Sequence, residues 1–77
     1  MGNIEKIIQK MHLQITDISF AELQKVLEYN GFQIVRQKGS HCFFRNKNGL
    51  GFTIPKTSPV KAIYVRLVLT IIEGDQK

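Results

Sequence analysis

The sequence predicts an α+β fold in the order helix, helix, strand, strand, strand, helix. Three observations lead to this prediction. Apolar residues recur at helical intervals near both ends of the chain, whereas the middle consists of short β-favouring runs separated by turn residues. A chain of 77 residues has room for one hydrophobic core. We therefore expect residues 1–77 to form a single domain with a three-stranded antiparallel sheet.

The first predicted helix extends from Asn3 to about Gln14. Its apolar residues are spaced three and four apart, which places them on one helical face: Ile4, Ile7, Ile8, Met11 and Ile15. Residues 1–16 are thus expected to be an N-terminal helical extension with one side to bury.

Local signals mark both ends of the second predicted helix. Ser19 and Glu22 have the spacing of a capping box, in which each side chain accepts a hydrogen bond from the other residue's backbone. Ile18 and Leu23 are placed for a hydrophobic staple around this N-terminus. Gly31 is expected to end the helix, because glycine readily adopts the left-handed conformation found there.

The middle of the chain predicts an antiparallel meander with strands at residues 32–37, 41–45 and 50–55. A turn at residues 38–40 joins the first two strands. The Asn48-Gly49 pair favours a hairpin turn between the second and third, since both residue types tolerate positive φ. Pro55 is expected to end the last strand, because it has no N–H for the sheet.

The last predicted helix begins with Ser58 as N-cap and Pro59 at the first helical position, and it ends near Glu73. Together with the second helix, it is expected to cover one face of the sheet. Its apolar residues extend beyond one face: Val60, Ile63, Tyr64, Val65, Leu67, Val68, Leu69, Ile71 and Ile72. The N-terminal helix is the first candidate to cover this excess, and a second protein chain is the next.

Charge is distributed unevenly along the chain, whose net charge is +5. No acidic residue occurs between Tyr29 and Ile72, whereas this segment contains the bases Arg36, Lys38, Arg45, Lys47, Lys56, Lys61 and Arg66. Uncompensated bases repel one another, so they favour a polyanionic partner such as nucleic acid. A basic surface facing only solvent remains the alternative.

Other functional classes lack support in the sequence. The single Cys42 cannot form an internal disulfide, no signal peptide is recognisable, and no apolar run approaches the roughly 20 residues of a membrane helix. We therefore expect a cytoplasmic protein with no membrane association. Cofactor-binding motifs and metal-ligand spacings are absent, so neither a cofactor nor a metal is expected.

His41 is the candidate catalytic residue. It follows the Gly39-Ser40 turn, with Arg36 and Lys38 before it and Arg45 after it. RNA carries its own nucleophile, the 2′-hydroxyl, and a histidine can accept the proton of that group near neutral pH. A histidine that only packs or forms hydrogen bonds would fit the same spacing.

Three segments resemble the HicA family of bacterial toxins: Gly31-Phe32, the run R-Q-K-G-S-H that ends at His41, and Ile54-Pro55. The likeness covers about residues 19–73. It implies a core similar to double-stranded RNA-binding domains, ribosome-independent cleavage of mRNA with His41 as the catalytic residue, and a HicB-type antitoxin as partner. The chain departs from the family pattern in two places. Many relatives have a second histidine where this chain has Cys42, and the loop after Pro55, which often carries another histidine in relatives, reads Lys56-Thr57-Ser58 here.

These observations combine into one hypothesis: a toxin that is a metal-independent mRNA endoribonuclease with His41 as general base. The expected RNA-binding residues are Arg36, Lys38, Ser40, Arg45 and Lys56. A non-catalytic RNA-binding module on the same fold is the first alternative. A protein whose basic face binds only an acidic protein partner is the second. The sequence leaves open the oligomeric state, the cleavage preference and the identity of the general acid.

Overall fold

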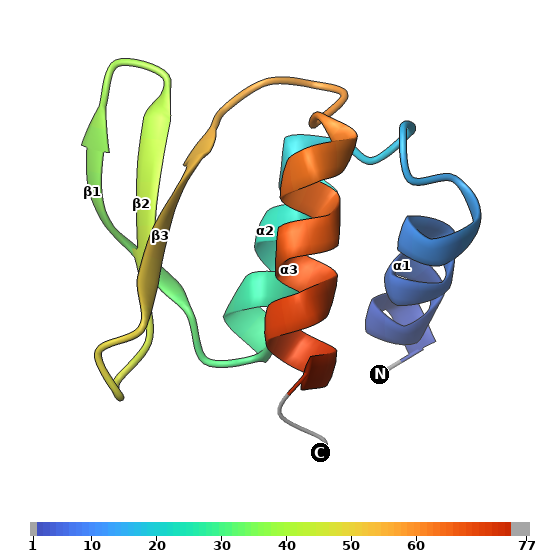
Figure 1. Ribbon diagram of the computed structural model, residues 1–77, viewed down its shortest axis with the longest axis horizontal. Coiled ribbons are helices and arrows are strands. Elements are labelled where there is room, and N and C mark those ends of the chain that lie inside the picture. Colours follow the sequence, from blue (N-terminus) through green and yellow to red (C-terminus); the bar gives the residue numbers. More distant parts are fainter. Residues whose placement is uncertain (1, 75–77) are drawn as a thin grey trace.

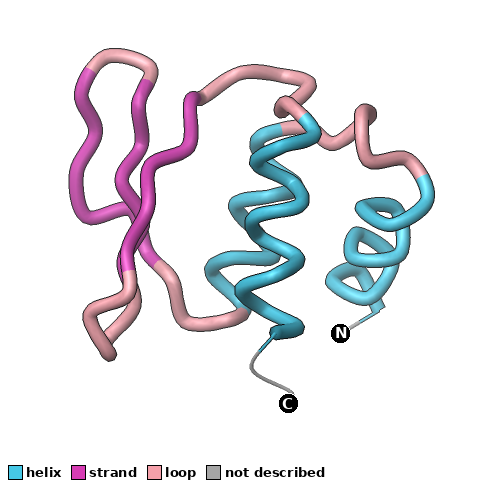
Figure 2. The backbone as a smooth tube through the Cα atoms, in the orientation of Figure 1, coloured by secondary structure: helices cyan, strands magenta, loops and turns pink. Residues whose placement is uncertain are grey.

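The computed structural model describes residues 2–74 and contains three layers (Figures 1 and 2). A three-stranded sheet forms the first layer, α2 and α3 lie side by side against one of its faces, and α1 covers the helices from the other side. The elements are α1 (Gly2–Leu13), α2 (Phe20–Tyr29), β1 (Gln33–Lys38), β2 (His41–Arg45), β3 (Gly51–Pro55) and α3 (Ala62–Gly74). The predicted α+β class and the order of elements are confirmed.

The sheet is antiparallel, with strand order β1-β2-β3. Gly39 and Gly49 have positive φ values of 59° and 90° in the two turns that join the strands, which is the conformation that glycine tolerates best. The register is regular between β2 and β3 but shifts between Ile34 and Arg36 of β1. This shift is a β-bulge with Val35 as the additional residue.

The core lies between the sheet and the helices. Phe44 at the centre of β2 is fully buried, with its ring centroid 6.1 Å from that of Phe20 and 6.0 Å from that of Phe52. The other buried side chains are Ile7, Met11, Ile18, Leu23, Val26, Leu27, Phe32, Cys42, Ile54, Val60, Val65, Val68 and Leu69. This core covers one face of the sheet and leaves the other without a helix.

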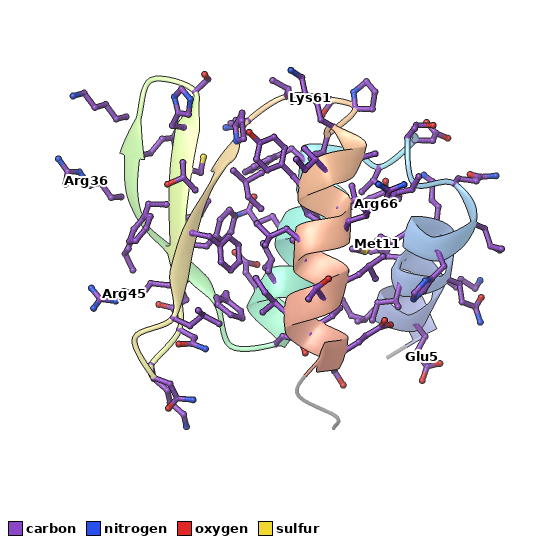
Figure 3. The ribbon with its side chains drawn as sticks, in the orientation of Figure 1. Glu5, Met11, Arg36, Arg45, Lys61 and Arg66 are labelled. Atoms are coloured by element: carbon purple, nitrogen blue, oxygen red, sulfur yellow. The ribbon has the colours of Figure 1, made fainter. Side chains whose placement is uncertain are left out.

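Helix α1 covers the apolar excess of α3, as the sequence predicts. Met11 is fully buried and lies on the side of α1 that faces α3 (Figure 3). At the far end of α3, Nε2 of His12 lies 2.9 Å from Oε2 of Glu73. The coverage is incomplete, because Ile63 remains 68% exposed.

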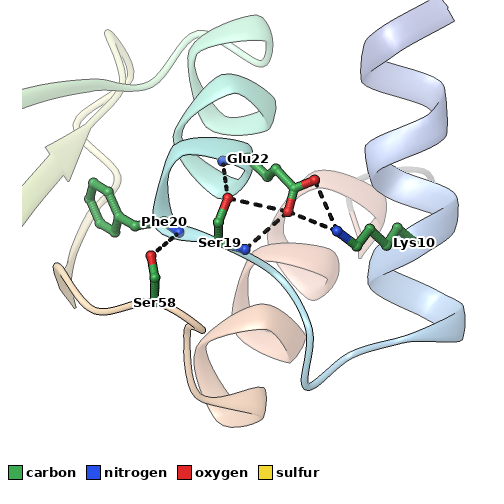
Figure 4. Close-up of polar contacts among 5 residues, drawn as sticks. All are labelled: Lys10, Ser19, Phe20, Glu22 and Ser58. Atoms are coloured by element: carbon green, nitrogen blue, oxygen red, sulfur yellow. Dashed lines mark hydrogen bonds and ion pairs between the residues drawn. The ribbon is translucent and has the colours of Figure 1, made fainter.

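The capping box of α2 is confirmed, and α1 adds to it (Figure 4). The Ser19 N–H donates to the Glu22 carboxylate at 3.0 Å, and Nζ of Lys10 lies 3.1 Å from the same carboxylate. The hydrogen bond from Ser19 is the main reason that the pKa of Glu22 is lowered from 4.5; partial burial opposes it and Lys10 adds to it. Ionised Glu22 therefore stabilises the fold fully above about pH 4.5. This contribution is lost as the pH falls through the lowered pKa.

The predicted start of the last helix is wrong. Helix α3 begins at Ala62, and neither Ser58 nor Pro59 is helical. The backbone N–H of Val60 instead donates to the carbonyl of Ile18 at 2.7 Å. The Ser58 hydroxyl accepts from the N–H of Phe20 at 3.2 Å, so it caps α2 in place of its own helix (Figure 4). Contacts with the segment before α2 thus hold residues 58–60 outside α3.

Candidate functional site

The side of the sheet that lacks helices carries the candidate site. Cys42 and Phe44 of β2 are fully buried, whereas His41 and Arg45 are exposed, as expected when successive side chains of a strand point to opposite faces. Figure 3 shows Arg36 and Arg45 pointing away from the helices. We call this side the outer face and define it by Arg36, Lys38, His41, Phe43, Arg45 and Thr53.

The bulge in β1 determines which of its side chains reach the outer face. Ile34 is paired with buried Phe44 and faces the core, so strict alternation would turn Arg36 toward the core as well. Because Val35 is inserted, Arg36 is paired with Phe43 and Lys38 with His41 instead. Both bases therefore share a face with the histidine.

His41 lines a small basic hollow. A cavity of about 260 Å³ on the outer face is lined by Arg36, Lys38, His41, Phe43 and Thr53. Lys38 is directly opposite His41 across the hairpin, where facing β-carbons are about 4.5–5.5 Å apart. The strands contribute no acidic residue. An anion in this hollow would thus meet two cationic side chains next to an exposed imidazole.

Ser40 and Lys56 lie at the same end of the sheet as His41. Ser40 is exposed in the β1–β2 turn, and its backbone carbonyl accepts a hydrogen bond from the N–H of Lys56. Pro55 is the β3 partner of His41, so Lys56 directly follows the residue beside the histidine. The structure thus brings these two predicted RNA-binding residues to the edge of the hollow.

Arg45 does not join this cluster. It lies on the outer face but at the opposite end of β2, about 13 Å from His41 at the usual rise of 3.3 Å per residue. It lines a separate hollow of about 330 Å³ together with Val35 and Lys47. Arg45 is therefore too far from His41 to contact the same small anion.

Sequence reasoning missed two residues of the hollow, Phe43 and Thr53. They are partners across β2 and β3, and Thr53 is exposed while Phe43 is half-buried. The signal was present in the alternation of His41, Phe43 and Arg45 along one strand. An aromatic residue in a largely apolar strand is easily assigned to the core. In β2, Phe44 is such a core residue, whereas Phe43 lines the hollow.

Position 42 faces the core. Cys42 is fully buried, and its strand partners are Gln37 and Ile54. A side chain at this position points away from His41 and from the outer face. A histidine at this position would therefore not contact a ligand bound at His41 without a change in the strand, and Cys42 does not line the hollow.

Within residues 2–74, no three His, Cys, Asp or Glu side chains are grouped closely enough to hold a metal ion. The other histidine of the chain, His12, lies on α1 and is paired with Glu73. Any chemistry on the outer face therefore depends on His41 and the surrounding bases. In the same described range, no helix is both long and apolar enough to span a membrane.

Comparison with known proteins identifies the family of this chain. The family model described as HicA toxin of bacterial toxin-antitoxin matches residues 20–73, which include α2, the whole sheet and nearly all of α3. The chain belongs to the HicA toxin family. No curated protein and no solved structure gives a significant match. The similarity of the HicA core to double-stranded RNA-binding domains therefore stays a prediction.

Membership of the HicA family identifies the chain as the toxin of a toxin-antitoxin pair, whose partner is an antitoxin. The matched segment contains all residues that line the hollow, so the entire hollow belongs to the family region: Arg36, Lys38, His41, Phe43 and Thr53. Helix α1 lies outside the match and contributes no residue to the outer face.

Proposed function

We propose that this HicA toxin is a ribosome-independent mRNA endoribonuclease that acts in the cytoplasm, with His41 as general base and Arg36, Lys38, Ser40, Arg45 and Lys56 as RNA-binding residues. The observation that carries this proposal is the hollow in which exposed His41 faces Lys38 and lies beside Arg36. A solvent-accessible base next to two cationic side chains supports cleavage by the 2′-hydroxyl, because the base can take its proton and the cations can stabilise the developing negative charge.

In the proposed reaction, His41 accepts the proton of a 2′-hydroxyl while the 2′-oxygen forms a bond to the adjacent phosphorus. The bond from phosphorus to the 5′-oxygen of the next nucleotide breaks, and that oxygen takes a proton from water or from a cationic side chain. The products are a 2′,3′-cyclic phosphate and a 5′-hydroxyl. Lys38 and Arg36 stabilise the negative charge that develops on the phosphoryl oxygens.

Digestion of a defined mRNA by the purified toxin tests this function. We expect cleavage without ribosomes that continues unchanged in EDTA, because the described residues provide no group of metal ligands. Activity that disappears in EDTA and returns with magnesium would contradict the metal-independent mechanism. Binding of the RNA without any cleavage would favour the non-catalytic RNA-binding module.

RNA affinity should decrease steeply with salt, because each Lys or Arg contact to a phosphate releases counterions. The slope of log affinity against log salt is about 0.7 per phosphate on a single strand. Lys38→Ala should reduce the slope by about this amount. Lys6→Ala, which removes the same charge from α1, is the matched control and should leave the slope unchanged. Equal effects of the two substitutions would show that RNA does not lie on the outer face.

We further propose that the antitoxin is of the HicB type and that it covers the outer face. Acidic groups placed over Arg36, Lys38 and Arg45 would neutralise the exposed bases and shield His41 in one step. RNA and the antitoxin should therefore compete. Titration of a toxin–RNA complex with the partner purified from the same operon should release the RNA, and a stable ternary complex would exclude this mode of inhibition.

A further inference from the structure

We propose that Phe43 is the platform on which one unpaired base of the RNA stacks, next to the nucleotide bond that is cut. This inference rests on the proposed function, since it takes RNA as the ligand of the outer face. It adds a substrate class to that function: the toxin acts on single-stranded segments.

The position of Phe43 is unusual for a phenylalanine in so small a core. Its strand neighbours Cys42 and Phe44 are fully buried, but Phe43 is half-buried and lines the hollow with His41. Arg36 is its partner on β1 and Thr53 its partner on β3. The two cross-strand partners of the ring on the outer face are thus one cationic and one polar side chain.

Gly51 determines how the ring lies. A β-carbon at position 51 would be only 2.8 Å from Cζ of Phe43, so the tip of the ring extends over the backbone of β3 at a point without a side chain. The ring thus leans along the sheet and does not stand upright in solvent. The ring nevertheless stays partly exposed beside basic side chains, and aromatic side chains in a positively charged groove are the platforms on which single-stranded bases stack.

The spacing to His41 fits one nucleotide and its neighbour. Phe43 and His41 are two residues apart on the same strand face, so their α-carbons are about 7 Å apart. The ring leans from there toward Gly51, the partner of Arg45, and thus away from His41. In the proposed mode, the base stacks on Phe43, and its own ribose or that of the next nucleotide along the strand reaches His41. The flanking phosphate then lies near Arg36 and Lys38, which line the same hollow.

This arrangement requires the stacked base to be unpaired. Within an A-form duplex both faces of a base are occupied by its stacked neighbours, and side chains reach only the edges and the backbone. A ring can stack only on a base that is single-stranded or turned out of a helix. The phenyl group has no hydrogen-bonding atom, so it can stack on any base. It therefore selects single-stranded RNA over duplex RNA and selects little for base sequence.

The competing explanation is structural: an aromatic ring that covers a glycine of the neighbouring strand stabilises a sheet. Two substitutions separate the roles. Phe43→Leu keeps apolar cover over Gly51 but removes the aromatic face. Phe43→Trp keeps an aromatic face and introduces the only tryptophan of the chain, whose fluorescence reports stacking.

The experiment uses a short oligonucleotide of 2′-O-methyl RNA, which cannot be cleaved because its 2′-oxygens carry no proton. The single strand should quench the tryptophan emission of Phe43→Trp, and the same sequence as a duplex should quench it far less. The affinity of Phe43→Leu for the single strand should be about 5- to 150-fold below that of the wild type, with an unchanged melting temperature.

Unquenched emission from folded Phe43→Trp, or full affinity of folded Phe43→Leu, would overturn the proposal. If Phe43→Leu does not fold, the quenching of Phe43→Trp decides alone. Because no cleavage is involved, the result is independent of the catalytic role of His41. Quenching in a protein that never cuts RNA would reject the nuclease and retain the stacking platform. Cleavage with unquenched emission would reject the stacking platform and retain the nuclease.

Discussion

Replacement of His41 by alanine should reduce the rate of RNA cleavage by about a hundred- to ten-thousand-fold, the usual contribution of a general base. The residue is exposed at the start of β2 and is not part of the buried core. Arg36 and Lys38 remain in place to bind phosphate. RNA affinity and melting temperature should therefore change little, and a cleavage time course, a binding titration and a melting curve on one preparation test all three expectations.

His12→Ala is the matched control for this substitution. It removes the same side chain from α1, where His12 is paired with Glu73 on the side of the helices away from the sheet. Cleavage should continue at the wild-type rate. A folded His41→Ala protein that cuts RNA as fast as the His12→Ala protein would end the assignment of His41 as the catalytic base.

Met11→Ala should produce a large loss of stability although Met11 lies far from the outer face. Met11 is fully buried between α1 and the other helices, and truncation of such a side chain costs about 2–5 kcal/mol. A domain of this size loses about 4–8 °C of melting temperature for each kcal/mol. We propose that residues 1–77 unfold as one cooperative domain, in which case the whole transition shifts, in circular dichroism and in calorimetry alike.

Leu13→Ala provides the comparison, since Leu13 is on the same helix but 82% exposed. Its truncation should leave the melting temperature nearly unchanged. If α1 were only an appendage to the region matched by the HicA family, Met11→Ala would leave the main transition at its wild-type temperature and remove helical signal at a lower one.

Much of the fold could be predicted because its signals are local. The capping box of Ser19 and Glu22, the glycines of the turns and the apolar periodicity of α1 each act within a few residues, and all are found in the structure. The start of α3 could not be predicted in this way. Ser58 has the local features of an N-cap, but its hydroxyl is used by Phe20, which is distant in the sequence.

The candidate site, too, could be predicted only in part. His41 and its basic neighbours are visible in the sequence, but their arrangement depends on the bulge at Val35. Whether Arg36 faces the core or the outer face changes with this one inserted residue, and no composition or turn signal indicates it. The role of Gly51 under the Phe43 ring is likewise a contact between strands, which only the three-dimensional structure reveals.

The nucleophile is the most direct test of the central claim that His41 activates a 2′-hydroxyl of the RNA. Once a cleavage site is mapped in an oligonucleotide, the ribose on the 5′ side of the scissile phosphate is replaced by deoxyribose. We predict that this site is no longer cut, that binding is retained, and that the wild-type products end in a 2′,3′-cyclic phosphate and a 5′-hydroxyl. Continued cleavage at the deoxyribose, with a 3′-hydroxyl and a 5′-phosphate as products, would show that water is the nucleophile and would contradict the mechanism.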